Sequence, residues 1–216
     1  MEKKEKQHEI GIQRVKNLYC QEYLVHGVKP KSLFWPKGRQ KVRFREHLEL
    51  IENKKLFNKK LTLIDYGCGF SDLYEYMTLK NLRNIDYVGI DIVEEFLSVS
   101  KSRYPQCKFF TRDEFLRDES VVADILIASG TFNIRYESTY QKNYDFFLDE
   151  LKTLASRIQT CLSVDFMTDE VDYMQLDSFH LNPKNLRRDI KKTISAEKVE
   201  IYKSEIPFEY RVQIWK

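Results

Sequence analysis

Residues 61–77, LTLIDYGCGFSDLYEYM, change their hydrophobic period halfway, and this change constrains the fold more than any other feature of the chain. The first half is a short apolar run that ends at Asp65, which is typical of a buried β-strand. Gly67 and Gly69 follow, and apolar residues then recur at helical spacing. The pattern predicts a strand that passes through a tight turn directly into a helix. Glycine in such a turn permits positive φ and lets a ligand approach the main chain closely.

Strand and helix patterns alternate from residue 61 onward. Five strands separated by helical stretches predict a parallel sheet with helices on both faces. Two more strands flank Pro207 with too few residues between them for a helical crossover, so they are predicted to pair antiparallel. The predicted strands are 61–66, 86–91, 107–110, 122–128, 158–166, 197–202 and 206–215. The predicted helices that follow them are 71–80, 93–104, 113–118, 136–156 and 183–193, the last with Asn182 as N-cap and Pro183 at its first position.

The N-terminal part of the chain has a different pattern and a different charge. Helices are predicted over 7–26 and 39–57, joined by a loop over 26–38. Residues 1–60 hold 16 Lys and Arg against 7 Asp and Glu, a balance of +9 in a chain whose net charge is +3. This excess fits a solvated pair of amphipathic helices, or a basic surface for an anionic substrate or nucleic acid. We expect residues 1–60 to form a helical cap and residues 61–216 a separate domain.

The composition is that of a globular protein, with 42% hydrophobic and 32% charged residues of mixed sign. The N-terminus is charged and has no signal-peptide pattern, and no apolar run is long enough to span a bilayer. We expect a cytoplasmic protein without membrane contact. No group of His, Asp or Glu has the spacing of metal ligands. The cysteines are scattered without a C-x-x-C pair, as in reduced thiols, and are Cys20, Cys68, Cys107 and Cys161.

An acid follows the glycine turn at the spacing of a nucleotide-binding site. Asp91 lies 22 positions after Gly69, at the end of the next predicted strand, where a carboxylate can hold ribose hydroxyls. The dinucleotide pattern requires a third glycine where this chain has Asp72, and a pyrophosphate would be repelled there. Asp65 also disfavours a pyrophosphate. A ligand with ammonium and sulfonium charges would be stabilised by these acids, which describes S-adenosylmethionine (SAM). The alternative is a purely structural turn.

Three stretches resemble the motifs of class I SAM-dependent methyltransferases. LIDYGCGFSDLYEYM resembles their first motif, YVGIDIVEEFL their second and ADILIASGTFN their fourth-strand motif, so the resemblance covers about residues 60–216. Ser71 stands where a third glycine is usual. A bacterial small-molecule-type subgroup also carries W-x(4)-Q-x-x-R-F before the first strand and A-S-G-x-F-N after the fourth. This chain matches both patterns, with Trp35, Gln40, Arg43, Phe44 and residues 128–133.

The resemblance implies a fold and a cofactor. The fold is α/β, with a seven-stranded, mostly parallel Rossmann-like sheet whose last strand is antiparallel, plus the N-terminal helical cap. SAM would lie with its methionine part on the 67–70 main chain, its ammonium group near Asp65, its ribose hydroxyls on Asp91 and its adenine on Ile92. Cys68 would be a small neutral filler in the turn. The implied cofactor-binding residues are Asp65, Gly67, Cys68, Gly69, Asp91, Ile92, Asp113, Ser129, Gly130 and Arg43.

Two of these assignments have structural alternatives. Asp113 is the expected partner of the adenine amino group, a task that Glu114 or Phe115 could share, but it could also simply cap the helix that it begins. Ser129 and Gly130 end the fourth strand, where a doubly wound sheet opens its ligand crevice. They are expected to line the path of methyl transfer, although Ser129 could be only a turn residue.

The residues that would bind the methyl acceptor are predicted less definitely than those that would bind SAM. Arg43 could grip the SAM carboxylate or a substrate anion, or could be a surface residue of its helix. Trp35 could be a lid or a core anchor. His180 lies in the loop after the fifth strand and is a candidate base, with His26 and Tyr140 as alternatives. Trp35, Tyr140 and His180 are therefore predicted substrate-binding residues, and no catalytic residue is assigned.

The resemblance implies a SAM-dependent methyltransferase that acts on O or N of a small-molecule or sugar-like acceptor, because only a short cap accompanies the core. One alternative is an RNA-modifying methyltransferase that uses the basic N-terminal segment to hold phosphates. The others are a non-catalytic methyltransferase-like protein and a nicotinamide-dependent oxidoreductase. The oligomeric state is left open.

Overall fold

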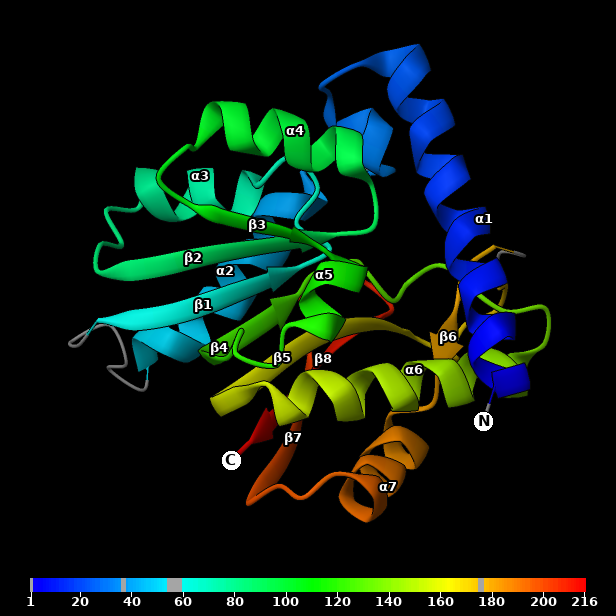
Figure 1. The fold of residues 1–216 in the computed structure, drawn as a ribbon. Helices are drawn as coiled ribbons and strands as arrows, with labels where there is room; N and C mark the ends of the chain where they lie inside the picture. Colours follow the sequence, from blue (N-terminus) through cyan, green and yellow to red (C-terminus); the bar gives the residue numbers. More distant parts are fainter. Residues whose placement is uncertain (1, 36–37, 54–59, 175–176) are drawn as a thin grey trace.

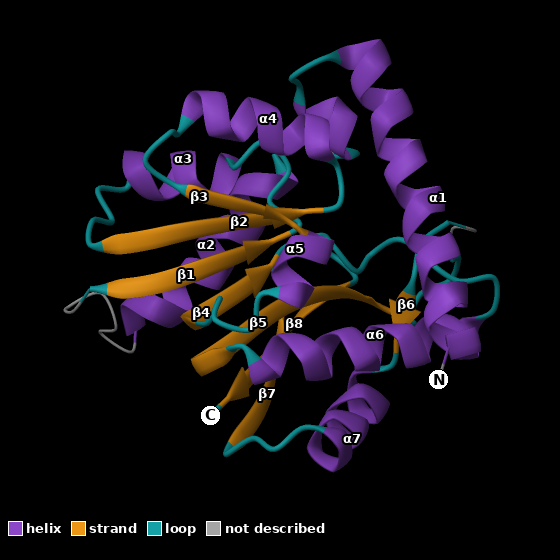
Figure 2. Ribbon diagram, in the orientation of Figure 1, coloured by secondary structure: helices purple, strands orange, loops and turns teal. Residues whose placement is uncertain are grey.

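The structure is a computed structural model, and it describes residues 2–35, 38–53, 60–174 and 177–216. A single sheet runs through its centre with helices on both faces (Figures 1 and 2). The strands are β1 Leu61–Tyr66, β2 Ile85–Asp91, β3 Lys108–Thr111, β4 Ala123–Ala128, β5 Ile158–Thr168, β6 His180–Leu181, β7 Lys198–Lys203 and β8 Glu209–Trp215. The helices are α1 Glu2–His26, the 3₁₀ turn η1 Pro30–Leu33, α2 Arg39–Asn53, α3 Asp72–Leu79, α4 Glu94–Arg103, α5 Arg112–Arg117, α6 Tyr140–Ser156 and α7 Pro183–Thr193.

The strand order is β3-β2-β1-β4-β5-β8-β7, so the order reverses between β1 and β4. The strands β1 to β5 pair in parallel, whereas β8 pairs antiparallel with both β5 and β7. The predicted α/β fold with an antiparallel last strand is thereby confirmed. The two-residue strand β6 was not predicted, since it is too short for a periodic signal, and it pairs with the end of β5.

Two apolar cores hold the layers together. One core packs α2 and α3 on one face of the sheet through side chains such as Phe44 and Leu73. The other packs α5, α6 and α7 on the opposite face and includes Phe115, Leu151 and Ile190. Both faces of the parallel strands are therefore covered, as such sheets require.

The two helices of the N-terminal segment pack at two different places on the sheet. Helix α1 crosses the side toward which the arrows of β1 and β2 point, which is their carboxyl edge (Figure 1). Val15 of α1 packs there against Tyr136 and Phe146. Helix α2 instead belongs to the layer on the sheet face. The predicted helix 39–57 is described over Arg39–Asn53, and residues 54–57 of that prediction lie outside the described residues.

Local capping explains where two helices begin. Asn182 caps α7 by accepting hydrogen bonds from Lys184 N and Asn185 N at 3.1 Å, as predicted. The predicted start of the sixth helix at residue 136 is wrong, because Thr139 Oγ1 accepts from Lys142 N and the helix begins at Tyr140. Residue 136 therefore belongs to the loop before the helix, and this changes which tyrosine reaches the cavity described below.

Candidate functional site

The glycine turn joins β1 to α3 and is tied to β2. Gly67 N and Cys68 N both donate to Ile90 O, at 2.7 and 2.9 Å. Gly67 has φ +80°, and a Cβ there would lie 2.3 Å from Thr131 Oγ1. Thr131 in turn donates to Tyr66 O at 2.7 Å. The turn after β1 and the loop after β4 thus meet through the Thr131 side chain, and a side chain at position 67 would collide with it.

Asp91 ends β2 and connects it to the turn. Its two carboxylate oxygens accept hydrogen bonds from Gly69 N at 2.8 Å and Val93 N at 2.9 Å. Burial raises the pKa of the Asp91 carboxyl to about 6, although the main-chain donors oppose the rise. Each oxygen keeps a further lone pair, so the carboxylate can still accept ligand hydroxyls.

Asp65 lies deeper, at the end of β1. Tyr87 donates its hydroxyl to the Asp65 carboxylate at 2.6 Å, and no cation contacts the carboxylate among the described residues. Burial raises the pKa of Asp65 to about 7, with smaller contributions from the charges of Asp91 and Asp72. Burial also raises the pKa of Cys68 well above its ordinary value, so that side chain is a neutral thiol.

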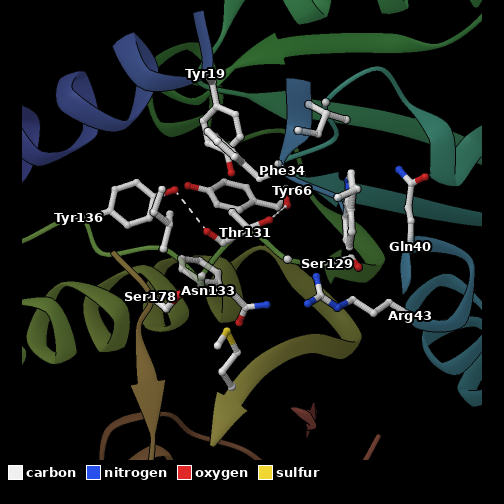
Figure 3. Close-up of a pocket in the computed structure, with 18 of the residues that line it drawn as sticks. Tyr19, Phe34, Gln40, Arg43, Tyr66, Ser129, Thr131, Asn133, Tyr136 and Ser178 are labelled. Carbon is white, nitrogen blue, oxygen red and sulfur yellow. Dashed lines mark hydrogen bonds between the residues drawn. The ribbon is translucent and has the colours of Figure 1, made fainter. Parts of the chain in front are cut away.

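A cavity of about 780 Å³ opens beside this turn, at the carboxyl edge of the sheet. Parallel sheets bind ligands at this edge where the strand order reverses, and the order reverses here between β1 and β4. Figure 3 shows Tyr19, Tyr136 and Arg43 reaching the cavity from different sides. The predicted site residues that line it are Trp35, Arg43, Asp65, Gly67, Cys68, Gly69, Asp91, Ile92, Ser129, Gly130 and His180.

The structure does not bring Asp113 to this cavity. Its side chain is 82% exposed, and it lies in the first turn of α5, whose N-cap is Thr111. Its neighbour Arg112 lines the cavity instead and forms an ion pair with Glu150. Neither Arg112 nor Glu150 was predicted from the sequence, because a lone Arg beside an expected acid does not indicate which of the two side chains faces the cavity.

Tyr140 is also outside the cavity. It is 46% exposed and stacks on Tyr144, with ring centroids 6.1 Å apart. Tyr136, four residues earlier, is buried and lines the cavity, and its hydroxyl donates to Thr131 O at 3.4 Å (Figure 3). The difference follows from the later start of α6.

Arg43 reaches the cavity from α2 but is largely committed to a protein partner. Its Nε and Nη2 donate to Glu209 at 2.6 and 2.7 Å, and its guanidinium lies 4.7 Å from the centre of the Trp35 ring. Gly130 lies so close that a Cβ there would be 2.8 Å from Arg43 Nη1. The third guanidinium nitrogen, Nη1, makes no hydrogen bond to Glu209 and lies beside Gly130.

A buried acid that sequence analysis missed organises the loop after β4. Asp165 of β5 accepts from Ser129 Oγ at 3.0 Å, Gly130 N at 2.8 Å and Asn133 Nδ2 at 3.2 Å. Burial acts to raise its pKa, but the charge of Arg43 and the hydrogen bonds of His47 and Gly130 N outweigh that effect and hold the pKa at about 2. Ser129 is thus a positioned residue of the cavity wall, and Asp165 fixes the loop that follows β4.

Comparison with known proteins supports the fold alone. No protein-family model matches the chain, and no curated protein sequence matches it. Magnesium protoporphyrin IX methyltransferase (ChlM) from Synechocystis PCC 6803, solved with SAH, superposes with a TM-score of 0.65 at 12% identity over 95% of this chain and 99% of that one. The plantazolicin methyltransferase BpumL, solved with a triazolic desmethylPZN analogue and SAH, gives 0.66 at 16% identity over 97% and 99%.

A third structure, small RNA methyltransferase HEN1, gives a TM-score of 0.56 at 15% identity over 82% of this chain and 25% of that one. The chain has the class I SAM-dependent methyltransferase fold. The neighbours differ in what they methylate, so the reaction of this chain must be argued from its own site. Among the described residues no helix is long and apolar enough to cross a bilayer, and no three His, Cys, Asp or Glu gather as a metal site.

Proposed function

We propose that the chain is a SAM-dependent methyltransferase that transfers a methyl group to O or N of a small-molecule acceptor. The observation that carries the proposal is the continuity of one cavity from the glycine turn and Asp91 to an apolar wall under α1. A bare main-chain turn with a carboxylate at the end of the next strand suits an adenosyl ligand. The rest of the cavity leaves room for a second molecule.

The cofactor would lie along the carboxyl ends of β1 and β2. Asp91 would accept from both ribose hydroxyls, and Ile92 would pack on the adenine. Asp65 would face the ammonium group, which supplies a cation that this buried carboxyl lacks among the described residues. Tyr19 and Phe34, whose ring centroids lie 5.3 Å apart, would cover the cofactor from the N-terminal segment. Both residues belong to residues 1–60, which we propose as a helical cap over the cofactor.

The charges of the cavity support a neutral or cationic acceptor. Among the described residues six carboxylate side chains line it against three guanidinium groups, and all three of those groups form ion pairs with Glu209 or Glu150 of the wall. A polyphosphate backbone would meet a negative field there. Sugar-like acceptors remain compatible with this field.

SAM, when bound, supplies a methyl group on a sulfonium, and methyl transfer is an in-line displacement at that carbon. The protein's main task is alignment, which contributes up to about 7–11 kcal/mol when reacting atoms are held in position. Ser129 and Gly130, fixed by Asp165, would border the path of transfer. Trp35, held by Arg43, would close the cavity above them.

Calorimetric titration with SAH tests the cofactor site. Asp91→Ala removes both ribose hydrogen bonds, and the loss of even one bond to a charged group costs about 1.5–3 kcal/mol, so affinity should fall by at least roughly 10- to 150-fold. Asp86→Ala is the matched control, because Asp86 lies on the same strand and its side chain is 59% exposed. Asp91→Asn retains an acceptor for one main-chain N–H and provides a second variant if alanine disturbs folding. Unchanged affinity in folded Asp91 variants would contradict the assignment.

Two alternatives are separated by simple measurements. A non-catalytic protein would either show no stabilisation by SAM or bind it, adding about 2.7 kcal/mol of stability at 100 times Kd, and in both cases would never convert SAM to SAH with any amine or alcohol in a panel. An RNA-modifying enzyme would bind RNA with an affinity that falls steeply between 50 and 200 mM salt. The excess of +9 in residues 1–60 is the observation that favours RNA.

A further inference from the structure

Two residues that line the acceptor side of the cavity are held next to each other by main-chain pairing. Asn133 lies in the loop after β4, and its carbonyl accepts from Phe179 N at 2.9 Å. The next residues along, Ile134 and Ser178, form an antiparallel bridge. His180 follows Phe179 directly and begins β6. Both residues therefore belong to one junction joined by main-chain hydrogen bonds and not to independent loops.

The tautomer of His180 is fixed by a carbonyl. Its Nδ1 lies 2.7 Å from Thr168 O, and a carbonyl oxygen only accepts, so Nδ1 carries the hydrogen. In the neutral ring Nε2 then holds a lone pair. The side chain is 4% exposed, and Nε2 has no hydrogen-bond partner among the described residues.

The amide of Asn133 is fixed in a similar way. Its Nδ2 donates to Asp165 Oδ1 at 3.2 Å, and the carboxylate of Asp165 only accepts. The amide cannot flip without placing Oδ1 against that carboxylate. Its Oδ1 is buried and, within the described part of the chain, has no partner.

Two residues that line one cavity thus each carry a buried acceptor atom that has no donor among the described residues. Buried polar atoms are nearly always paired in folded proteins, and unpaired ones call for an explanation. A ligand group that pairs with either atom must be a hydrogen-bond donor, because another acceptor would be repelled by both.

We infer that Asn133 Oδ1 and His180 Nε2 form the acceptor subsite and take a molecule with an O–H or N–H donor, whose proton passes to His180. This inference rests on the proposed function. A lone pair on the acceptor atom forms the new bond to the methyl carbon, and the carbon–sulfur bond breaks with its electron pair on sulfur. The acceptor proton moves to Nε2, and the imidazolium then loses it to water. Hydroxyl and primary or secondary amine acceptors fit, whereas carboxylates and ethers do not.

Paired fragments test the subsite in the SAH-loaded protein. Benzyl alcohol and aniline carry donors, whereas benzyl methyl ether and N,N-dimethylaniline keep the apolar ring without a neutral-state donor. In ligand-detected NMR titrations at pH 8 we expect each donor fragment to bind about 5-fold more tightly than its methylated partner. Asn133→Leu and His180→Phe should each reduce this preference to less than about 2-fold. His26→Phe, a change at the far end of α1, should leave it intact.

The outcomes separate the subsite from the cofactor site. Equal binding of donor and methylated fragments to the unmodified protein would overturn the subsite, as would a preference that persists in both variants. Nitrogen-15 correlation spectra should find the hydrogen of His180 on Nδ1, and a hydrogen on Nε2 would also overturn it. If SAH itself does not bind, the proposed function fails. If SAH binds but the donor preference is absent, only the subsite fails.

Discussion

Asp65→Asn should make the free protein more stable at pH 8 while weakening its hold on SAM. The Asp65 carboxyl is 3% exposed and accepts the Tyr87 hydroxyl at 2.6 Å, with no cation beside it among the described residues. An asparagine oxygen can accept the same hydrogen bond without a charge. The substitution therefore removes a buried negative charge and little else.

The magnitude follows from the pKa of this carboxyl. Burial raises the pKa of Asp65 from 3.8 to about 7, so the native state binds a proton more tightly than the unfolded chain. Stability then falls as the pH rises from about 4 through 7, and the loss is complete above that range. One pKa unit corresponds to about 1.36 kcal/mol, which sets an upper limit of roughly 4 kcal/mol. We expect Asp65→Asn to gain about 2–4 kcal/mol over the unmodified protein at pH 8 and almost nothing at pH 4.

Urea denaturation at pH 4, 6 and 8 measures this difference directly. The exposed Asp86→Asn serves as the control, and its stability should follow the unmodified protein at every pH. Calorimetry at pH 8 should find weaker SAM binding to Asp65→Asn, because the ammonium group loses its counter-charge. A variant no more stable than the unmodified protein at pH 8, or a difference independent of pH, would refute the reasoning.

Four further expectations concern the site and its ligands. Glu209→Leu leaves the buried Arg43 without its bidentate partner and should cost about 3–5 kcal/mol in urea denaturation, whereas Glu205→Leu at an exposed carboxylate should cost far less. Gly67→Ala places a Cβ 2.3 Å from Thr131 Oγ1 at φ +80° and should lower both SAH affinity and the free energy of unfolding, the latter by about 1–3 kcal/mol. SAH binding at pH 7 should release protons as Asp65 ionises, which calorimetry in two buffers of different ionisation enthalpy detects. Fluorescence anisotropy with a labelled RNA should find no tight, salt-dependent binding between 50 and 200 mM salt.

Local signals in the sequence were sufficient for the framework of the fold. The strand at 61–66 and the helix at 183–193 have the predicted bounds, because an apolar run before glycine and an Asn-Pro cap act through neighbouring residues. The antiparallel pairing of the last two strands could be predicted from the short connection around Pro207. Each of these signals is contained within a few residues.

The composition of the cavity wall depends on tertiary structure and was predicted less well. Tyr136 replaces Tyr140 because one capping threonine moves the start of α6. Arg112 lines the cavity where Asp113 was expected, since which residue of a first helical turn faces inward depends on the docking of that helix. Asp165 carried no motif at all, and its role comes from residues more than 30 positions away. Such contacts are invisible to periodicity.

The central claim is that the cofactor binds at the glycine turn and Asp91. A structure of crystals grown with saturating SAH tests this claim most directly. We expect SAH in the cavity beside the glycine turn, with both ribose hydroxyls within about 3.2 Å of the Asp91 carboxylate and the homocysteine portion along the main chain of residues 67–69. An empty cavity at saturating SAH, or SAH bound away from this turn, would contradict the claim.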